Sequence, residues 1–301
     1  MRIAFVVWRF PVLSEPFILN QIAGLLDRGH DVRIFALNGA PEATGKAHDL
    51  VARHGMMERA SLVAPLPETG GAAAVARRLA GPALRHPVMA LRLMAQVLSG
   101  GVASPLKMLN RAATLMDAGR FDIVHCQFGS LAPPVLAFRR AGLLQGRLVT
   151  HFRGIDISSY VVEHGRDVYD RVFAESDYFL ANCAFFRDKA IALGCPPERI
   201  ASHGSGIDLA AFPFRMPPPV EDGVATLISA GRLVEKKGLA HAIRAVGRLT
   251  AGGRRVRYRI IGDGPERARL EALIAELGLG ESVQLLGWRT HTEMARLLAS
   301  A

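Results

Sequence analysis

The 301-residue sequence lacks several features that define whole classes of protein. It has only three cysteines, which cannot all pair, and none lies in a C-x-x-C motif. It has no run of 18 uncharged apolar residues, and its first apolar stretch, which ends before Arg9, is short for a secretory signal. A disulfide framework, a zinc site and a membrane-spanning helix are therefore not expected. These absences predict a cytoplasmic protein with reduced thiols.

Acidic residues are also scarce beside basic ones, 27 against 37, which gives a net charge of +10. Such a charge favours a phosphate-rich substrate, an anionic membrane surface or a nucleic acid as partner. The basic residues are not interleaved with aromatic ones, and no recognition-helix motif is present, so we expect no nucleic-acid partner. Half of the residues are hydrophobic, which predicts ordinary globular cores.

Short apolar runs rich in Val, Ile and Phe alternate with segments of helical period in both halves of the chain. This alternation predicts an α/β fold with a parallel sheet covered on both faces. In the first half we expect a helix over 15–28 and strands over 2–8, 31–37, 121–127, 147–152 and 178–182. In the second half we expect strands over 224–229, 256–261 and 282–286, and helices over 239–250, 265–277 and 290–300. In the helix over 265–277, a buried stripe is predicted for Leu270, Leu273, Ile274 and Leu277.

A proline-rich segment divides the two halves. Residues 208–223 include three consecutive prolines, which fit neither a helix interior nor a central strand, and we expect an interdomain linker there. The predicted domains are 1–207 and 224–301, with a ligand site in the cleft between them. Because the second domain has only three clear strands, we expect the natural protein to continue for about 70–90 residues.

A basic helical insertion is predicted at about 72–118. Residues 72–116 contain no Asp or Glu but six basic side chains, interspersed with Leu, Val and Met. Two interpretations remain open at this stage. One is docking on an anionic membrane surface. The other is a helix pair that packs on its own domain and leaves a solvated basic face.

Glycine-rich segments in the second half indicate phosphate chemistry. Arg267 stands where a dinucleotide-binding G-x-G-x-x-G motif beginning at Gly262 needs its third glycine, and no G-x-x-x-x-G-K-[ST] motif occurs. A dehydrogenase or a P-loop enzyme is therefore not expected. The basic loop over 231–238 lies between a strand and a helix, where Arg232 and Lys237 can bind a phosphate beside helix N-terminal amides.

These motifs together resemble a known family. Residues 229–238, followed by 262–265, are similar to the C-terminal donor domain of retaining glycosyltransferase family 4. Residues 10–21, 122–129 and 154–158 resemble the bacterial exopolysaccharide and colanic-acid type members of that family. The resemblance implies the GT-B fold, in which two Rossmann-like domains face each other across a cleft, here with an incomplete second domain.

The resemblance implies a donor site. Arg232 and Lys237 would neutralise the diphosphate as the sugar leaves. Gly262 and Gly264 would let the backbone approach the nucleotide. Trp288 would lie near the base, although simple packing at a strand end is the commoner role of such a tryptophan. Ser14 and Glu15 would face the donor phosphates, and for Ser14 a helix N-cap is the alternative structural role.

The predicted catalytic residues are His125, His151, Arg153 and Asp156. His125 shares a strand face with Gln127, as His151 does with Arg153, because side chains alternate along a strand. Many family members carry His-Gly-x-Asp on the acceptor side, whereas this sequence reads Arg153-Gly154-Ile155-Asp156. Either His151 replaces that histidine from the same strand face, or Arg153 binds an acceptor phosphate. Asp156 remains a candidate polar contact.

The implied activity is retaining transfer of a hexose from a nucleotide diphosphate sugar to a growing, lipid-linked exopolysaccharide at the cytoplasmic face of the membrane. No cofactor and no obligatory metal are expected. The family's E-x7-E pair, which holds the sugar and the ribose, has no counterpart here, because no two glutamates are eight positions apart. We therefore expect weak or absent activity from this chain. The alternatives are a GT-B sugar-nucleotide epimerase or hydrolase and an inactive nucleotide-sugar-binding remnant.

Overall fold

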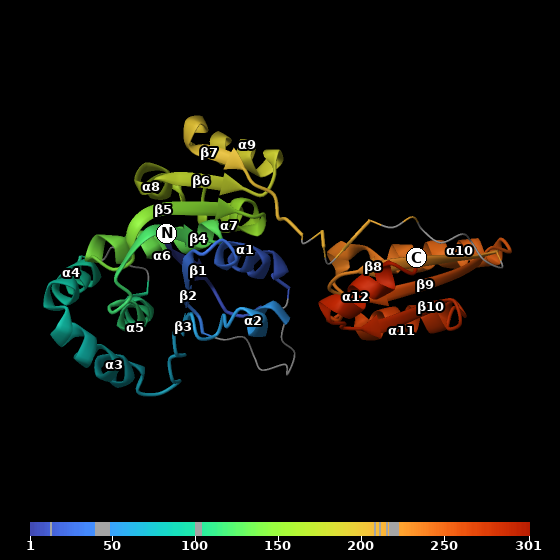
Figure 1. Cartoon of the computed structure of the whole chain (residues 1–301), viewed down its shortest axis with the longest axis horizontal. Helices are drawn as coiled ribbons and strands as arrows, with labels where there is room; N and C mark the ends of the chain where they lie inside the picture. The colour runs from blue at the N-terminus through green and yellow to red at the C-terminus, as the bar shows by residue number, and fades with distance from the viewer. Residues whose placement is uncertain are drawn as a thin grey trace. The chain divides into compact units, whose positions relative to one another are not determined.

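The computed structural model describes residues 1–12, 14–39, 49–99, 104–207, 209–210, 212–214, 216 and 223–301. The chain divides into two compact units, Met1–Gly206 and Ile207–Ala301 (Figure 1). Of the linker predicted over 208–223, residues 208, 211, 215 and 217–222 lie outside the described residues. Each unit is a parallel α/β structure, which confirms the predicted class.

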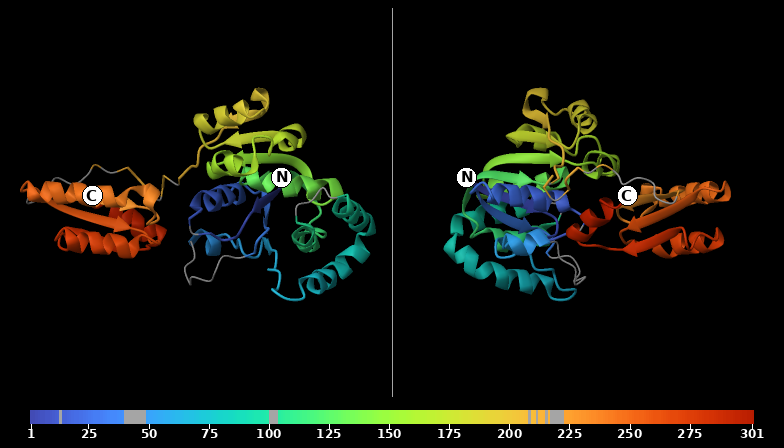
Figure 2. Two further views of the ribbon diagram at one scale, coloured as in Figure 1. Left: turned by 180° about the vertical axis from the view of Figure 1, so that it is seen from behind. Right: turned by 45° about the vertical axis from the view of Figure 1, so that its right-hand side comes forward.

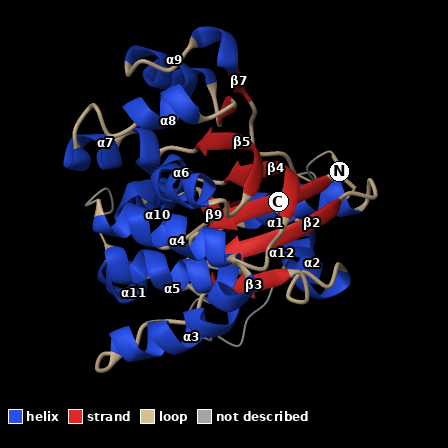
Figure 3. Ribbon diagram, turned by 90° about the vertical axis from the view of Figure 1, so that its left-hand side faces the viewer, coloured by secondary structure: helices blue, strands red, loops and turns tan. Residues whose placement is uncertain are grey.

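The first unit is built on a seven-stranded parallel sheet with the order β3-β2-β1-β4-β5-β6-β7. Neighbouring strands run side by side in the same direction (Figure 3). The five predicted strands are present within two residues of their expected ends. The strands are β1 (Arg2–Val7), β2 (Asp31–Ala36), β3 (Ala60–Leu62), β4 (Arg120–Cys126), β5 (Gln145–Phe152), β6 (Tyr178–Ala181) and β7 (Ile200–Ser202).

Side chains alternate between the two faces of each strand, so a hydrophobic core forms on each face of this sheet. In β1, Ile3 and Phe5 pack on one face and Ala4 and Val6 on the other. Helix α1 covers the first face, and α6 covers the second. The helices of this unit are α1 (Pro16–Leu26), α2 (Asp49–Arg53), α3 (Gly71–Arg85), α4 (Pro87–Leu98), α5 (Pro105–Leu115), α6 (Ala132–Ala141), α7 (Ser159–His164), α8 (Asp170–Glu175) and α9 (Ala184–Ala192).

The start of α1 corrects one prediction. The helix begins at Pro16, its N-cap residue is Glu15, and no side chain caps it. Ser14 is therefore not the N-cap. Proline at the first helical position already has a helical φ and lacks one of the N–H groups that a helix start leaves unpaired, and the Ile18 N–H donates to the Glu15 carbonyl at 3.0 Å.

The predicted insertion contains three helices rather than a pair. Helices α3 and α4 form the outer arc of the first unit, and α5 lies inside that arc (Figures 1 and 2). Residues 100–103 of this segment lie outside the described residues. Within the described parts of the chain, no helix is both long and apolar enough to cross a membrane.

The second unit has a three-stranded parallel sheet with the order β10-β9-β8. Leu270, Leu273 and Ile274 are buried as predicted, but Leu277 is 40% exposed because the helix ends at Glu276. The elements are β8 (Val224–Ala230), α10 (Leu239–Ala251), β9 (Arg255–Ile261), α11 (Arg267–Glu276), β10 (Val283–Gly287) and α12 (His291–Leu298).

Candidate functional site

The candidate residues of the first unit gather at the carboxyl edge of its sheet. Gln127 follows β4, Arg153 follows β5, and the loop that leads to Glu15 follows β1, which is the neighbour of β4. In open parallel sheets, ligands bind at this edge. The fold therefore brings Glu15, His125, His151, Arg153 and Asp156 into one region of the first unit.

Arg153 is the central charge of this region. Its Nε donates to the Gln127 carbonyl at 3.1 Å, and its Nη2 donates to Gln127 Oε1 at 2.7 Å and to Gln21 Oε1 at 3.4 Å. Its Nη1 donates to Ser205 Oγ at 3.3 Å, and the guanidinium lies 4.4 Å from the centre of the Phe17 ring. All of these partners are uncharged.

Burial lowers the pKa of Arg153 to about 10, against the opposing effect of the negative charges of Asp156 and Glu15. The side chain is therefore still a cation at neutral pH. Among the described residues, none forms an ion pair with it. The half-buried guanidinium thus donates to uncharged groups, with the Asp156 and Glu15 carboxylates acting on it from a distance, and it remains a cation that can bind an anion arriving from outside.

Asp156 organises the turn that carries Arg153. Its buried carboxylate accepts the backbone N–H groups of Gly129 at 2.7 Å, Gly154 at 2.8 Å, Arg153 at 3.0 Å and Ile157 at 3.1 Å. Burial raises the pKa of Asp156, whereas these backbone hydrogen bonds act to lower it. With its oxygens occupied by four amides, Asp156 positions Arg153. Its predicted polar contact with a substrate stays a prediction.

His125 and His151 form a stacked pair beneath this edge. Their ring centroids are 5.8 Å apart at an interplanar angle of 4°, and His203 lies 6.0 Å beyond His151. The predicted pairing of His125 with Gln127 on one strand face is confirmed by a hydrogen bond of 3.3 Å from Gln127 Nε2 to His125 Nδ1. His125 Nε2 and both nitrogens of His151 have no hydrogen-bond partner within the described structure.

Burial, together with the charge of Arg153, lowers the pKa of His125 to about 3 and that of His151 to about 2. Both imidazoles are therefore neutral at physiological pH. His151 has no exposed surface. The rings lie beneath the surface, and the predicted catalytic role of these two histidines stays a prediction.

The loop before α1 contributes the remaining predicted residues of the first unit. Ser14 is exposed, and Glu15 donates its backbone N–H to the Val12 carbonyl at 3.1 Å. The Glu15 charge acts on Arg153. Sequence reasoning missed Phe17 and Gln21, which contact Arg153 from α1. Their spacing of four residues places them on one helix face and was the available signal.

In the second unit, backbone hydrogen bonds join the ends of the three strands. The Gly231 N–H donates to the Ile261 carbonyl and the Gly262 N–H to the Gly287 carbonyl, both at 2.9 Å, and the Leu233 N–H donates to the Asp263 carbonyl at 3.0 Å. The loops that follow β8, β9 and β10 are therefore adjacent. The fold thus brings Arg232, Lys237, Gly262, Gly264 and Trp288 to one sheet edge, with Trp288 half-buried.

The two predicted glycines are required by the packing of these loops on each other. A Cβ on Gly262, whose φ is +140°, would lie 1.8 Å from the Gly231 carbonyl oxygen. A Cβ on Gly264 would lie 2.5 Å from the Leu233 carbonyl oxygen. Loop packing alone therefore excludes a side chain at both positions. Their predicted close approach to a nucleotide stays a prediction.

Arg232 and Lys237 are exposed cations on either side of the fully buried Leu233. In the described part of the chain, neither forms an ion pair with a carboxylate. Gly238, in the left-handed conformation, forms the N-cap of the 13-residue helix α10. Two unpaired cations beside a helix N-terminus have the chemistry of an anion-binding site.

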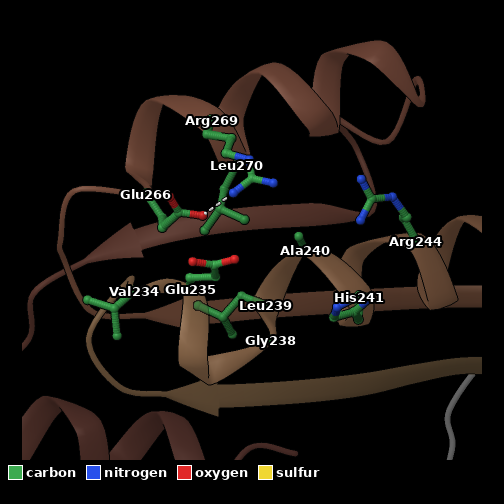
Figure 4. A pocket seen from close by; sticks show the side chains of 10 residues that line it. All are labelled: Val234, Glu235, Gly238, Leu239, Ala240, His241, Arg244, Glu266, Arg269 and Leu270. Carbon is green, nitrogen blue, oxygen red and sulfur yellow. Dashed lines mark hydrogen bonds and ion pairs between the residues drawn. The ribbon is translucent and has the colours of Figure 1, made fainter. Parts of the chain in front are cut away.

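A pocket of about 250 Å³ lies near these loops, at the starts of α10 and α11 (Figure 4). Its lining includes Glu235, His241 and Arg244, and the ion pair of Glu266 with Arg269 at 2.9 Å. None of the predicted donor residues lines it. Across the described residues of both units, no group of three or more His, Cys, Asp or Glu side chains is arranged to hold a metal ion.

Family models match both units of the chain. Residues 14–206 match a glycosyl transferase 4-like domain, and residues 214–301 match the glycosyl transferases group 1. The chain is 33% identical over 320 residues to the amylovoran biosynthesis glycosyltransferase AmsK of Erwinia amylovora. It is 31% identical over 308 residues to WcaL of Salmonella typhimurium, which is named for colanic acid biosynthesis. Both matches cover the whole chain and 74% of the relative.

Solved structures show the same fold. Anabaena HepE, in a complex with UDP and glucose, matches with a TM-score of 0.61 at 17% identity over the whole chain and 72% of its own length. The sucrose-phosphate synthase of Thermosynechococcus elongatus matches with a TM-score of 0.63 at 15% identity, over the whole chain and 74% of its own length. The resemblance inferred from the sequence motifs is thereby confirmed, and the chain belongs to the GT-B glycosyltransferases of the group 1 and 4-like family.

Proposed function

We propose that this protein transfers a hexose from a nucleotide diphosphate sugar to a growing, lipid-linked exopolysaccharide at an anionic membrane surface, with retention of configuration. The family membership and the names of the relatives AmsK and WcaL support exopolysaccharide synthesis. The single observation that carries the donor assignment is the pair of exposed, unpaired cations Arg232 and Lys237 at the carboxyl edge of the second sheet.

The donor diphosphate would lie against these two cations. When the bond from the sugar C1 to the phosphate oxygen breaks, both electrons stay on the diphosphate, which gains negative charge. Arg232 can hold two phosphate oxygens with its planar fork, and Lys237 adds a point charge. Because this charge grows as the bond breaks, the two side chains stabilise the transition state more than the bound donor.

The acceptor would lie at the edge of the first sheet, where Arg153 is the anion-binding group. A lipid-linked saccharide carries phosphate next to its first sugar, and Arg153 is a half-buried cation that forms no ion pair with a described carboxylate. For retention, the acceptor hydroxyl attacks the face from which the diphosphate leaves and gives its proton to the departing phosphate oxygen. No metal and no cofactor take part in this scheme.

Binding is the first readout of this proposal, because the sequence contains no E-x7-E pair and weak turnover is expected. Isothermal calorimetry with UDP- and GDP-hexoses should identify a donor. The double variant R232A/K237A should weaken its binding at least tenfold, whereas R254A/K189A, which removes the same charge elsewhere, should not. Equal binding by wild type and R232A/K237A would refute the donor assignment.

Transfer is then measured with the donor that binds and a lipid diphosphate-linked saccharide. Formation of a longer saccharide with the anomeric configuration of the donor supports the proposal. Release of free monosaccharide, or epimerisation of the donor without acceptor, would favour the hydrolase or epimerase alternative. Donor binding without any of these products would favour a nucleotide-sugar-binding remnant.

A further inference from the structure

Helices α3 and α4 expose an apolar surface that the sugar-transfer site does not use. Leu84 at the end of α3 is 84% exposed. On α4, Val88, Leu91 and Leu98 are 59%, 72% and 80% exposed. Their spacing of three and seven residues places all three on one side of the helix. We call Leu84, Val88, Leu91 and Leu98, with the exposed Arg77 and Arg92, the α3–α4 face.

The opposite side of α4 packs against the core of the first unit. Leu93 is buried in the core of the first unit, and Met89 and Val97 pack against the same core. Helix α4 is therefore apolar on two sides, with Arg92 and Gln96 as its only polar residues. A helix that is apolar nearly all round is usually buried on all sides. Here the outer side is open, along the outer arc of the first unit (Figure 2).

The arginines of this segment divide into two sets. Arg78 donates to Asn110 Oδ1 at 2.7 Å, Arg85 pairs with Asp117, and Arg111 donates to the Leu37 carbonyl at 3.1 Å. These three side chains fasten the helices to their own unit. Arg77 and Arg92 are exposed, and within the described residues neither forms an ion pair.

Charge decides which occupant fits the α3–α4 face. Residues 72–116 contain no Asp or Glu, so α3 and α4 carry no negative charge of their own, and Asp117, beside their junction, is paired with Arg85 and His86. A second copy that met this face with its own would bring arginines against arginines. An anionic bilayer instead offers acyl chains to the leucines and headgroup phosphates to the guanidinium groups.

We propose that the α3–α4 face docks on an anionic lipid bilayer, with α3 and α4 in the plane of the interface. The leucines enter the boundary between headgroups and acyl chains, and Arg77 and Arg92 contact the phosphates. This docking deepens the proposed function, because it rests on an acceptor that is held in the membrane. The docking proposal is tested by binding of the protein to vesicles. Its outcome is therefore independent of whether the protein transfers a sugar.

The experiment is flotation of the full chain with vesicles of phosphatidylcholine, with and without 30% phosphatidylglycerol. Wild type should bind the anionic vesicles, and binding should weaken with salt. L84S/L91S/L98S should lower the apparent affinity at least tenfold, and R77Q/R92Q should remove most of the preference for phosphatidylglycerol. Because these side chains are exposed, thermal unfolding should be unchanged.

Matched controls lie elsewhere on the first unit. V162S removes an apolar side chain that is 88% exposed on α7, and R53Q/R171Q removes two exposed arginines from α2 and α8. Both controls should bind vesicles as wild type does. Absence of wild-type binding to anionic vesicles, or equal losses in the control variants, would overturn the proposal. So would a dimer in light scattering that L84S/L91S/L98S dissociates, because it assigns the face to a second copy.

Transfer to a water-soluble acceptor fragment separates the two proposals. If L84S/L91S/L98S retains this transfer but loses transfer to the vesicle-bound acceptor, the docking proposal is supported. If it loses vesicle binding with no change in transfer to the vesicle-bound acceptor, the inferred link between docking and the acceptor is wrong.

Discussion

The buried imidazoles of His125 and His151 should make the first unit less stable in mild acid. In the unfolded chain each ring binds a proton as the pH falls below its ordinary value of 6.5, whereas burial, with the charge of Arg153, holds the folded pKa values at about 3 and about 2. The unfolded state therefore binds more protons between these limits. Stability is fully present above pH 6.5 and is lost as the pH falls.

The size of this loss of stability follows from the ordinary histidine pKa of 6.5. At pH 5 the rings are still neutral in the folded state. The change in the free energy of unfolding therefore comes only from protons that bind to the unfolded chain. Linkage then gives about 2 kcal/mol per histidine, and about 4 kcal/mol for the pair, between pH 7.5 and pH 5. This is a large part of the stability of an ordinary domain.

Urea unfolding at pH 7.5 and pH 5 measures the effect. The emission of Trp8, whose Nε1 donates to Ser130 Oγ at 3.2 Å in the first unit, reports on that unit once the second tryptophan is removed by W288F. His125→Gln and His151→Gln should each reduce the loss between the two pH values by about 2 kcal/mol.

The absolute stability of each variant is not the test, because a buried amide has its own cost. The control is Thr150→Val in the same strand, which changes a buried side chain with no titratable group. It should lower stability equally at both pH values. If wild type and both histidine variants lose the same stability on acidification, the assignment of neutral, buried imidazoles is refuted.

Three further predictions follow from the packing of the two sites. Gly262→Ala should destabilise the second unit by about 3 kcal/mol in urea unfolding, because its Cβ would overlap the Gly231 carbonyl. The control Gly278→Ala, whose Cβ would have no atom within 4 Å, should cost only about 1 kcal/mol. Asp156→Asn should lower the free energy of unfolding of the first unit by about 2 kcal/mol, because the side-chain NH2 group of Asn donates and cannot accept a backbone N–H. An unchanged unfolding midpoint would argue against the arrangement of four backbone N–H groups around Asp156. Arg153→Gln should raise the KM for a phosphate-bearing acceptor about tenfold and leave that for a phosphate-free fragment unchanged; equal effects on both acceptors would contradict phosphate binding.

The sequence was sufficient to predict the strands that run through the sheet interiors. Strand β1 is a continuous apolar run after Arg2, because both faces of a parallel sheet are covered. Strands β3 and β7 were missed because three residues at a sheet edge carry no measurable period. The predicted residues of each unit also meet at one sheet edge, since the carboxyl ends of parallel strands lie together.

The roles of individual side chains were less predictable. Asp156 reads as a polar contact in the sequence, but its acceptance of four backbone N–H groups depends on a turn that folds back on it and on Gly129, 27 residues away. Gly262 reads as a ligand contact, yet the oxygen that excludes its side chain belongs to Gly231. In both cases the decisive partner is distant in the sequence, where a motif carries no information about it.

The resemblance places Arg153 where many family members carry histidine, and an arginine there gives the first site different electrostatics. Burial lowers the pKa of a histidine and favours its neutral form, whereas Arg153, with a pKa of about 10, keeps its charge at neutral pH. The neutral imidazoles of His125 and His151 beneath it add no repulsion, and the Asp156 carboxylate is engaged by backbone amides. At this edge Arg153 therefore presents a positive charge that does not change near neutral pH, with the Glu15 carboxylate acting on it. An anion bound there would be held by a guanidinium whose own protonation stays constant over that range.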